Sequence, residues 1–179
     1  MGTRTICRLL FIFLFGCLIL AASQIEKDPL YKVATEKRDR LRERLRDYVA
    51  ENRNRDWAHL YDLVSATGRG KTDKPTFVER MKVGHGTDFA NDPDLLEFQA
   101  DRTDSNDSGI DVYGCAKAKR EGEGYDGIAV VHAVFEHDDW FFTGWTFVGG
   151  ECTELADKDW KLPARIKWTQ PMEELRTPK

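Results

Sequence analysis

The sequence predicts an α+β fold, with helices in its first part and an antiparallel sheet in its second. Between residues 30 and 65 apolar side chains recur at helical spacing, and from residue 95 they alternate with polar ones as in half-buried strands. Residues 126–149 are two apolar, aromatic and β-branched runs joined by a polar turn at 136–139, which is typical of a long β-hairpin. An immunoglobulin-like or lipocalin-like β-protein is the alternative fold, and the helical first part counts against it.

Length and composition indicate one globular domain. The chain has 179 residues, of which 41% are hydrophobic and 11% aromatic, and this is enough for a core of its own. The formal net charge of −4 argues against a general nucleic-acid binder.

Residues 1–23 have the pattern of a secretory signal peptide. Residues 1–8 carry two arginines and no acid, an apolar run follows, and Ala21, Ala22 and Ser23 are small enough for cleavage near Ser23. The apolar run is shorter than the roughly 20 residues that span a bilayer, and the alternative is a membrane anchor formed by the uncleaved segment. We therefore expect a secreted or periplasmic protein in which residues 24–30 form a short tether.

Two cysteines remain after the leader, Cys115 and Cys152. In a chain that enters an oxidising compartment we expect a disulfide between them, and two separate buried thiols are the alternative. Such a bridge contributes about 3–4 kcal/mol in the chain-entropy model. Cleavage of the leader removes Arg4 and Arg8, which leaves 25 of the 27 basic residues against 31 acidic ones. The mature chain is therefore acidic, with a formal net charge near −6.

A long amphipathic helix is predicted from Leu30 to Val49, following Pro29 at a position that a first helical turn tolerates. Its other face alternates basic and acidic side chains. That face is either a basic strip for nucleic acid or anionic lipid, or a solvated face with pairs such as Glu36 with Arg40, and we favour the second interpretation.

Two shorter helices should follow. One covers 55–65, with Asp56 as its cap and Trp57, Leu60, Tyr61 and Val64 on one face. The other is short, at 75–81. The GKT tail at 70–72 lacks the first glycine of a phosphate-binding loop and a preceding strand, so it is a helix exit.

Three strand regions complete the predicted fold. In 95–101 the buried side is Leu96, Phe98 and Ala100, and in 110–120 one face carries Ile110, Val112, Gly114, Ala116 and Ala118, which are small enough for close helix packing. In the hairpin, a turn at 138–139 alone puts His132 opposite Trp145, and a turn one residue longer puts it opposite Gly144.

No metal site is predicted. His85, Asp88, Asp92 and Asp94 have neither helical nor strand spacing for ligands, and residues 104–109 imitate a calcium loop but have Cys115 where a bidentate Glu is needed. Asn106 begins a sequon for glycosylation in a eukaryotic secretory pathway.

The order of elements resembles the nuclear transport factor 2-like superfamily, which includes ketosteroid isomerase, scytalone dehydratase and the polyketide cyclases. Two helices and a short third one precede long antiparallel strands, and a polar turn is followed by Trp140 and the run WFFTGW. The resemblance covers 31–153 and implies a cystatin-like α+β cone, in which a strongly curved sheet wraps around the helices and leaves a pocket. Residues 154–179 are expected as an extended tail with Trp160 and Trp168 docked in grooves.

Fold alone does not fix function, so two functions are carried forward. The first is an exported, non-catalytic domain that binds a small apolar ligand or a protein partner. The second is a cofactor-free isomerase, dehydratase or cyclase, with His132 as its acid–base residue and Tyr61 or Tyr113 as hydrogen-bond donor. The candidate pocket residues are Trp57, Tyr61, Tyr113, His132 and Trp145. No cofactor and no nucleic acid are expected, and the resemblance also implies a homodimer through an open sheet face.

Overall fold

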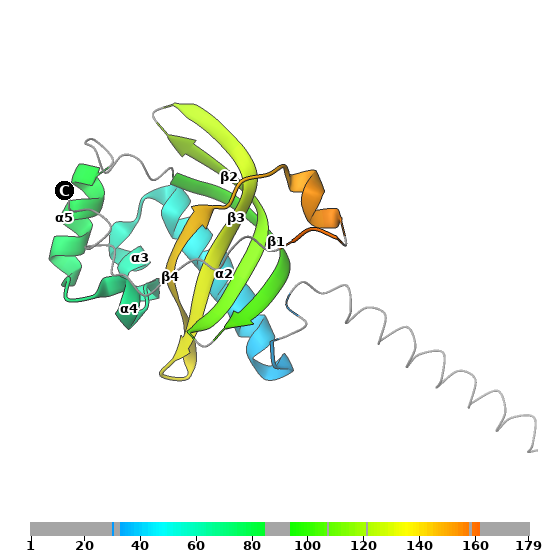
Figure 1. The fold of residues 1–179 in the computed structure, drawn as a ribbon. Coiled ribbons are helices and arrows are strands. Elements are labelled where there is room, and N and C mark those ends of the chain that lie inside the picture. The colour runs from blue at the N-terminus through cyan, green and yellow to red at the C-terminus, as the bar shows by residue number, and fades with distance from the viewer. Residues whose placement is uncertain are drawn as a thin grey trace, which may run out of the picture.

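The computed structural model describes residues 30, 33–84, 94–106, 108–120, 122–157 and 159–161. Within this part the chain forms helices and then an antiparallel sheet, which confirms the predicted α+β class (Figure 1). The helices are α2 (Thr35–Asn54), α3 (Trp57–Leu63), α4 (Ala66–Arg69) and α5 (Lys74–Gly84). The strands are β1 (Asp94–Asn106), β2 (Gly109–Arg120), β3 (Glu123–Glu136) and β4 (Asp139–Phe147), and the 3-10 helix η2 (Cys152–Ala156) follows them.

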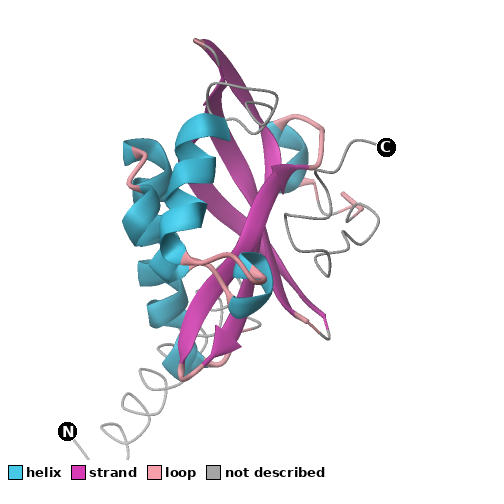
Figure 2. Ribbon diagram, turned by 90° about the vertical axis from the view of Figure 1, so that its left-hand side faces the viewer, coloured by secondary structure: helices cyan, strands magenta, loops and turns pink. Residues whose placement is uncertain are grey.

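The sheet has the order β1-β2-β3-β4, so each strand pairs with the next one along the chain. All three pairs are antiparallel. Helices α2, α3 and α5 lie on one side of this twisted sheet and η2 lies on the other, as Figure 2 shows, while the short α4 packs against β4. We refer to these as the helix face and the outer face of the sheet.

Alternation along the central strands sorts their side chains between the two faces. Val112 and Ala116 of β2 and Val131 of β3 pack with the helices in the main core, as the sequence predicts for β2. Tyr48 of α2 packs on Phe142 of β4 there, with 4.6 Å between ring centroids. A second, smaller cluster lies on the outer face and consists of Tyr113, Ile128, Val130 and Leu155.

Helix α2 begins later and ends later than predicted. Leu30 and Val33 are buried but precede the helix, which starts at Thr35. It ends at Asn54, and the following Arg55 closes the last turn through its left-handed backbone (φ 56°) and its N–H bond to the Asn52 carbonyl. The charged face differs from the prediction too, because Arg40 donates to Glu43 and to Asp139 of β4 rather than pairing with Glu36.

The second predicted helix is divided in two. Asp56 caps α3 as predicted, by accepting from the His59 N–H at 3.1 Å. The chain then leaves the helix at Val64, which forms a parallel bridge to Phe142 and is buried there. Ser65 caps the following α4, since its hydroxyl accepts from the Gly68 N–H. The predicted helix is therefore interrupted because Val64 pairs with β4, although its apolar residues continue at helical spacing.

The third helix and the first strand are both longer than predicted. Helix α5 starts at Lys74, and β1 starts at Asp94 and runs to Asn106. Irregular pairing between Leu95 and Glu97 makes Leu95, rather than Leu96, the buried residue at the start of β1. Such bulges shift the alternation of side chains by one position.

The hairpin turn consists of His137 and Asp138, both with positive φ (50° and 63°), which is typical of a tight two-residue turn. This turn alone would place His132 opposite Thr143. An irregularity between His132 and Ala133 moves the pairing to Gly144. The second predicted register is therefore correct, but a bulge and not a longer turn produces it.

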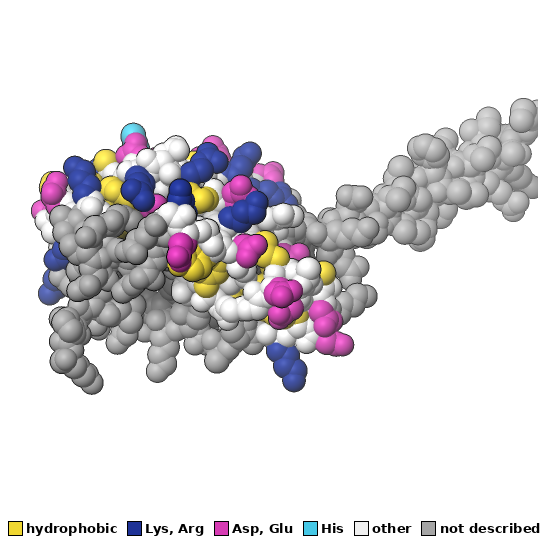
Figure 3. Space-filling view, turned by 90° about the horizontal axis from the view of Figure 1, so that it is seen from above, with side chains coloured by type: hydrophobic (Ala, Val, Ile, Leu, Met, Phe, Trp, Pro, Cys, Tyr) yellow, Lys and Arg dark blue, Asp and Glu magenta, His cyan; other side chains and the backbone are white. Residues whose placement is uncertain are grey.

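Several sequence-based expectations fall outside the described residues: the leader and tether up to residue 29, the metal-like residues His85, Asp88 and Asp92, and Trp168. Among the described helices, none is both long and apolar enough to cross a bilayer. Seen from above, the described surface interleaves basic and acidic side chains instead of collecting one sign (Figure 3).

Candidate functional site

His132 and Asp111 form a buried pair on the outer face of the sheet. They are directly paired residues of β3 and β2, and His132 Nδ1 lies 2.6 Å from Asp111 Oδ1. Their side chains are 1% and 3% exposed. His132 interrupts an apolar strand, and the carboxylate of Asp111 supplies the polar partner that a buried imidazole requires.

Tyr113 lies two residues after Asp111 on β2, so it shares the outer face with this pair, and it is itself buried. Burial, and to a smaller extent the nearby carboxylates of Asp111 and Asp104, together raise the pKa of its phenol to about 12. Trp160 packs edge-on against the Tyr113 ring, with 5.8 Å between centroids. Tyr113 is therefore held as a neutral phenol under an aromatic cover.

The other three candidate residues lie on the helix face. Trp57 is buried in the main core, and the partly buried Tyr61 and Trp145 pack against this core. The Tyr61 hydroxyl donates to the Thr72 carbonyl at 3.0 Å, and its ring packs on Phe77. The sheet thus separates Trp57, Tyr61 and Trp145 from Tyr113 and His132, and the five do not line one pocket.

The helix face carries a feature that sequence analysis did not identify. The central strands present very small residues there: Gly114 pairs with Ala129, and Ala116 pairs with Gly127. Aromatic side chains flank them, Phe98 from β1 on one side and Phe147 and Trp145 from β4 on the other. We call this set, Phe98, Gly114, Ala116, Gly127, Ala129, Trp145 and Phe147, the aromatic trough.

The floor of the trough is buried and its walls are half-exposed. Ala116 and Ala129 are fully buried, whereas Phe98, Trp145 and Phe147 all keep part of their surface in solvent. Phe98 leans over Gly114 so closely that a Cβ at this glycine would lie 2.8 Å from the ring. Trp145 and Phe147 are edge-to-face, with 5.4 Å between centroids. The alternation in 110–120 indicated the small residues, but only strand pairing shows which aromatic rings border them.

Among the residues that the structure describes, one group of side chains has metal-binding atoms close together. Oxygen or nitrogen atoms of Glu51, Asp56 and His59 lie within 4.8 Å of one another at the junction of α2 and α3. The Asp56 carboxylate is already used there, because it caps α3 and accepts from His59 Nδ1 at 2.7 Å. This hydrogen bond raises the pKa of His59 and lowers that of Asp56. Capping accounts for the arrangement.

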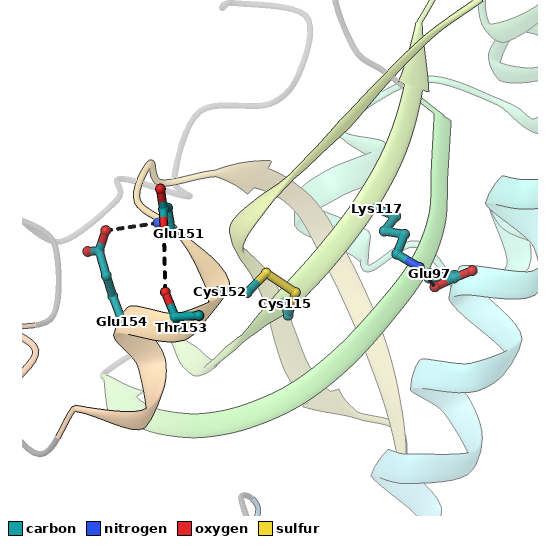
Figure 4. Close-up of a disulfide and its surroundings, with 7 residues drawn as sticks. All are labelled: Glu97, Cys115, Lys117, Glu151, Cys152, Thr153 and Glu154. Carbon is teal, nitrogen blue, oxygen red and sulfur yellow. Dashed lines mark hydrogen bonds and ion pairs between the residues drawn. A yellow bond between two sulfur atoms is a disulfide. The ribbon is translucent and has the colours of Figure 1, made fainter.

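The disulfide between Cys115 and Cys152 is present, as predicted, and links β2 to η2 on the outer face (Figure 4). Disulfides of this kind are typical of proteins from oxidising compartments.

No family model and no curated protein matches this chain. A solved structure that resembles it in part is the solution structure of a SEC-C motif containing protein from Rhodopseudomonas palustris, with a TM-score of 0.41 and 16% sequence identity. The match covers 59% of this chain and 77% of that one. What this protein does therefore has to follow from its own residues.

Proposed function

We propose that this protein is an exported, non-catalytic domain that binds a small apolar ligand on the helix face of its sheet. In this proposal the fold is a cone of the nuclear transport factor 2-like kind, and the aromatic trough lies in its mouth. The single observation that carries the proposal is the trough itself: half-exposed aromatic walls on both sides of a floor of glycine and alanine.

Small residues in the floor let the aromatic rings come close to the backbone of the sheet, as Phe98 does over Gly114. Aromatic walls offer a flat apolar ligand edge-to-face and stacking contacts on both sides. Ligand sites are mostly lined by apolar and aromatic side chains in this way. A molecule of one or two rings is the class of ligand that fits such a surface best.

The position of His132 supports a non-catalytic role. Its ring is 1% exposed and belongs to the outer face, so a ligand in the trough would be separated from it by the sheet. General acid–base catalysis needs the side chain within hydrogen-bond reach of the reacting group. One observation favours the enzyme as a second candidate, namely the short hydrogen bond between His132 and Asp111, an arrangement that acid–base sites also use.

The test is a fluorescence titration of the oxidised mature protein with 1-anilinonaphthalene-8-sulfonate, a small aromatic probe. We expect saturable binding that Trp145→Ala and Phe147→Ala each weaken about tenfold, the effect of losing one or two kcal/mol of aromatic contact. Phe135→Ala is the matched control, because this half-exposed ring lies near the far end of β3 and faces Lys37 of α2.

Two results would contradict the proposal. One is the absence of saturable binding to the folded protein, and the other is equal weakening by Phe135→Ala and Phe147→Ala. Turnover of a ketosteroid that His132→Asn abolishes and Phe147→Ala leaves intact would instead establish the enzyme.

A further inference from the structure

The chain after β4 forms a strap across the outer face of the sheet. We define the C-terminal strap as residues 148–157 and 159–161. Gly149 and Gly150, both with positive φ (84° and 92°), turn the chain out of β4, a backbone that other residues rarely adopt. Figure 4 shows η2 next, started by a capping box between Glu151 and Glu154 and joined to β2 by the disulfide.

The strap is held by contacts that are separate from the main core. Leu155 is buried in the outer cluster with Tyr113, Ile128 and Val130, while the helices pack only in the cluster on the other face. Arg102 of β1 donates to the carbonyls of Leu155 and Asp157, and its guanidinium lies 5.5 Å from the Trp160 ring. Backbone hydrogen bonds of Val148 and Gly150 to Ile128 hold the start of the strap. Beyond Gly150, its contacts with the sheet among the described residues are the disulfide, the Leu155 anchor, the Arg102 hydrogen bonds and the packing of Trp160 on Tyr113.

Both sulfur-bearing residues are partly exposed to solvent. Thiol–disulfide exchange requires access of an attacking thiolate to one sulfur, and the partial exposure of both residues favours such access. An external dithiol attacks one sulfur, the Cys115–Cys152 bond breaks and a mixed disulfide forms. The second thiol of the reductant then displaces the protein thiolate. The protein gains two electrons and two protons, and the dithiol becomes a disulfide.

We propose that reduction of Cys115–Cys152 releases the strap while the helices and the four-stranded sheet stay folded. The redox state of the disulfide thus controls whether the strap covers Tyr113, Ile128 and Val130. Segments held by few buried contacts open with low local free energy, independently of the rest of a protein. The strap is such a segment once its covalent link is gone, whereas α2 and β3 share the main core and do not depend on that link.

Hydrogen exchange tests this proposal on the mature protein, oxidised and in dithiothreitol. We expect amides of residues 152–157 to exchange about tenfold faster or more after reduction, while amides of α2 and of the buried part of β3 keep their protection. The variant Cys115→Ser/Cys152→Ser should behave like the reduced protein and should not respond to dithiothreitol.

Tyrosine nitration provides an independent readout. In the serine variant, Tyr113 should become reactive toward tetranitromethane, with the 40% exposed Tyr125 as an internal standard that reacts in both forms. Unchanged exchange at 152–157 after reduction would overturn the proposal. Simultaneous loss of protection in the strap and in α2 would overturn it too, because the bridge would then maintain the whole fold.

Discussion

His132 Nδ1 lies 2.6 Å from Asp111 Oδ1 between the two central strands, and both side chains are almost completely buried. A polar pair in this position is stabilising only while both partners are present. Removing one leaves the other buried without that partner, which costs more than the pair contributes relative to apolar side chains.

Replacement of the pair should therefore be strongly non-additive. We expect Asp111→Leu and His132→Leu each to lower the free energy of unfolding by about 3 kcal/mol. The double variant should lose at least about 1 kcal/mol less than the sum of the two. Urea unfolding of the four proteins measures this coupling. Asp111→Asn, which keeps an acceptor oxygen of similar shape, should be the mildest change, and strictly additive losses would contradict the argument.

Asp139 at the start of β4 predicts a dependence of stability on acid. Hydrogen bonds from Arg40 and Arg44 of α2 hold the pKa of its carboxyl far below the usual value of 3.8. Because the folded-state pKa is lowered, this contribution is complete above the unfolded pKa and is lost as pH falls toward the folded one. Asp139→Asn should cost about 2 kcal/mol at neutral pH, a value that allows for the partial exposure of both arginines.

The same pair of proteins gives the check. The difference in unfolding free energy between wild type and Asp139→Asn should be constant from neutral pH down to about pH 4 and should shrink below it. A difference that stays constant down to about pH 2 would show that the carboxylate charge is not what links α2 to β4.

Gly68 should not tolerate alanine, although alanine is ordinarily the better helix former. An added Cβ would lie 2.8 Å from Val64 Cγ1 and 2.9 Å from the Thr143 carbonyl oxygen, where α4 meets β4. Overpacking of this kind costs about 1–3 kcal/mol. Thermal unfolding should show it, and Gly124→Ala, which meets nothing within 4 Å, should be close to neutral. Equal melting temperatures for the two variants would contradict the close packing.

Features set by neighbouring residues could be predicted from the sequence. The Asp56 cap needs only a side-chain acceptor near the next turn of helix, and the inward face of β2 needs only alternation. The polar run also locates the turn at 136–139, although its central residues are His137 and Asp138. In each case the deciding interaction spans a few residues.

Features set by pairing between distant segments could not be predicted. Val64 leaves its helix because Phe142 offers it a bridge, and the bulge beside His132 decides which residue of β4 faces it. Arg40 donates to an aspartate 99 residues away as well as to Glu43 in its own helix. The trough depends in the same way on three strand registers at once. The pattern of residues in a single sequence does not show which of these distant segments will pair.

The buried phenol of Tyr113 should make the stability of the protein depend on pH in the alkaline range, because the strap covers it. Burial raises its pKa from 10.0 to about 12. An acid with a raised folded-state pKa stabilises the protein below its unfolded pKa, and this contribution disappears as pH rises through the folded one. We therefore expect wild type to lose stability between pH 10 and 12 and Tyr113→Phe to lose less.

In Cys115→Ser/Cys152→Ser the released strap should expose the phenol of Tyr113 to water again, so that its absorbance near 295 nm follows a pKa nearer 10. A phenol that still titrates near 12 in that variant would mean that Trp160 and Leu155 cover Tyr113 without the disulfide.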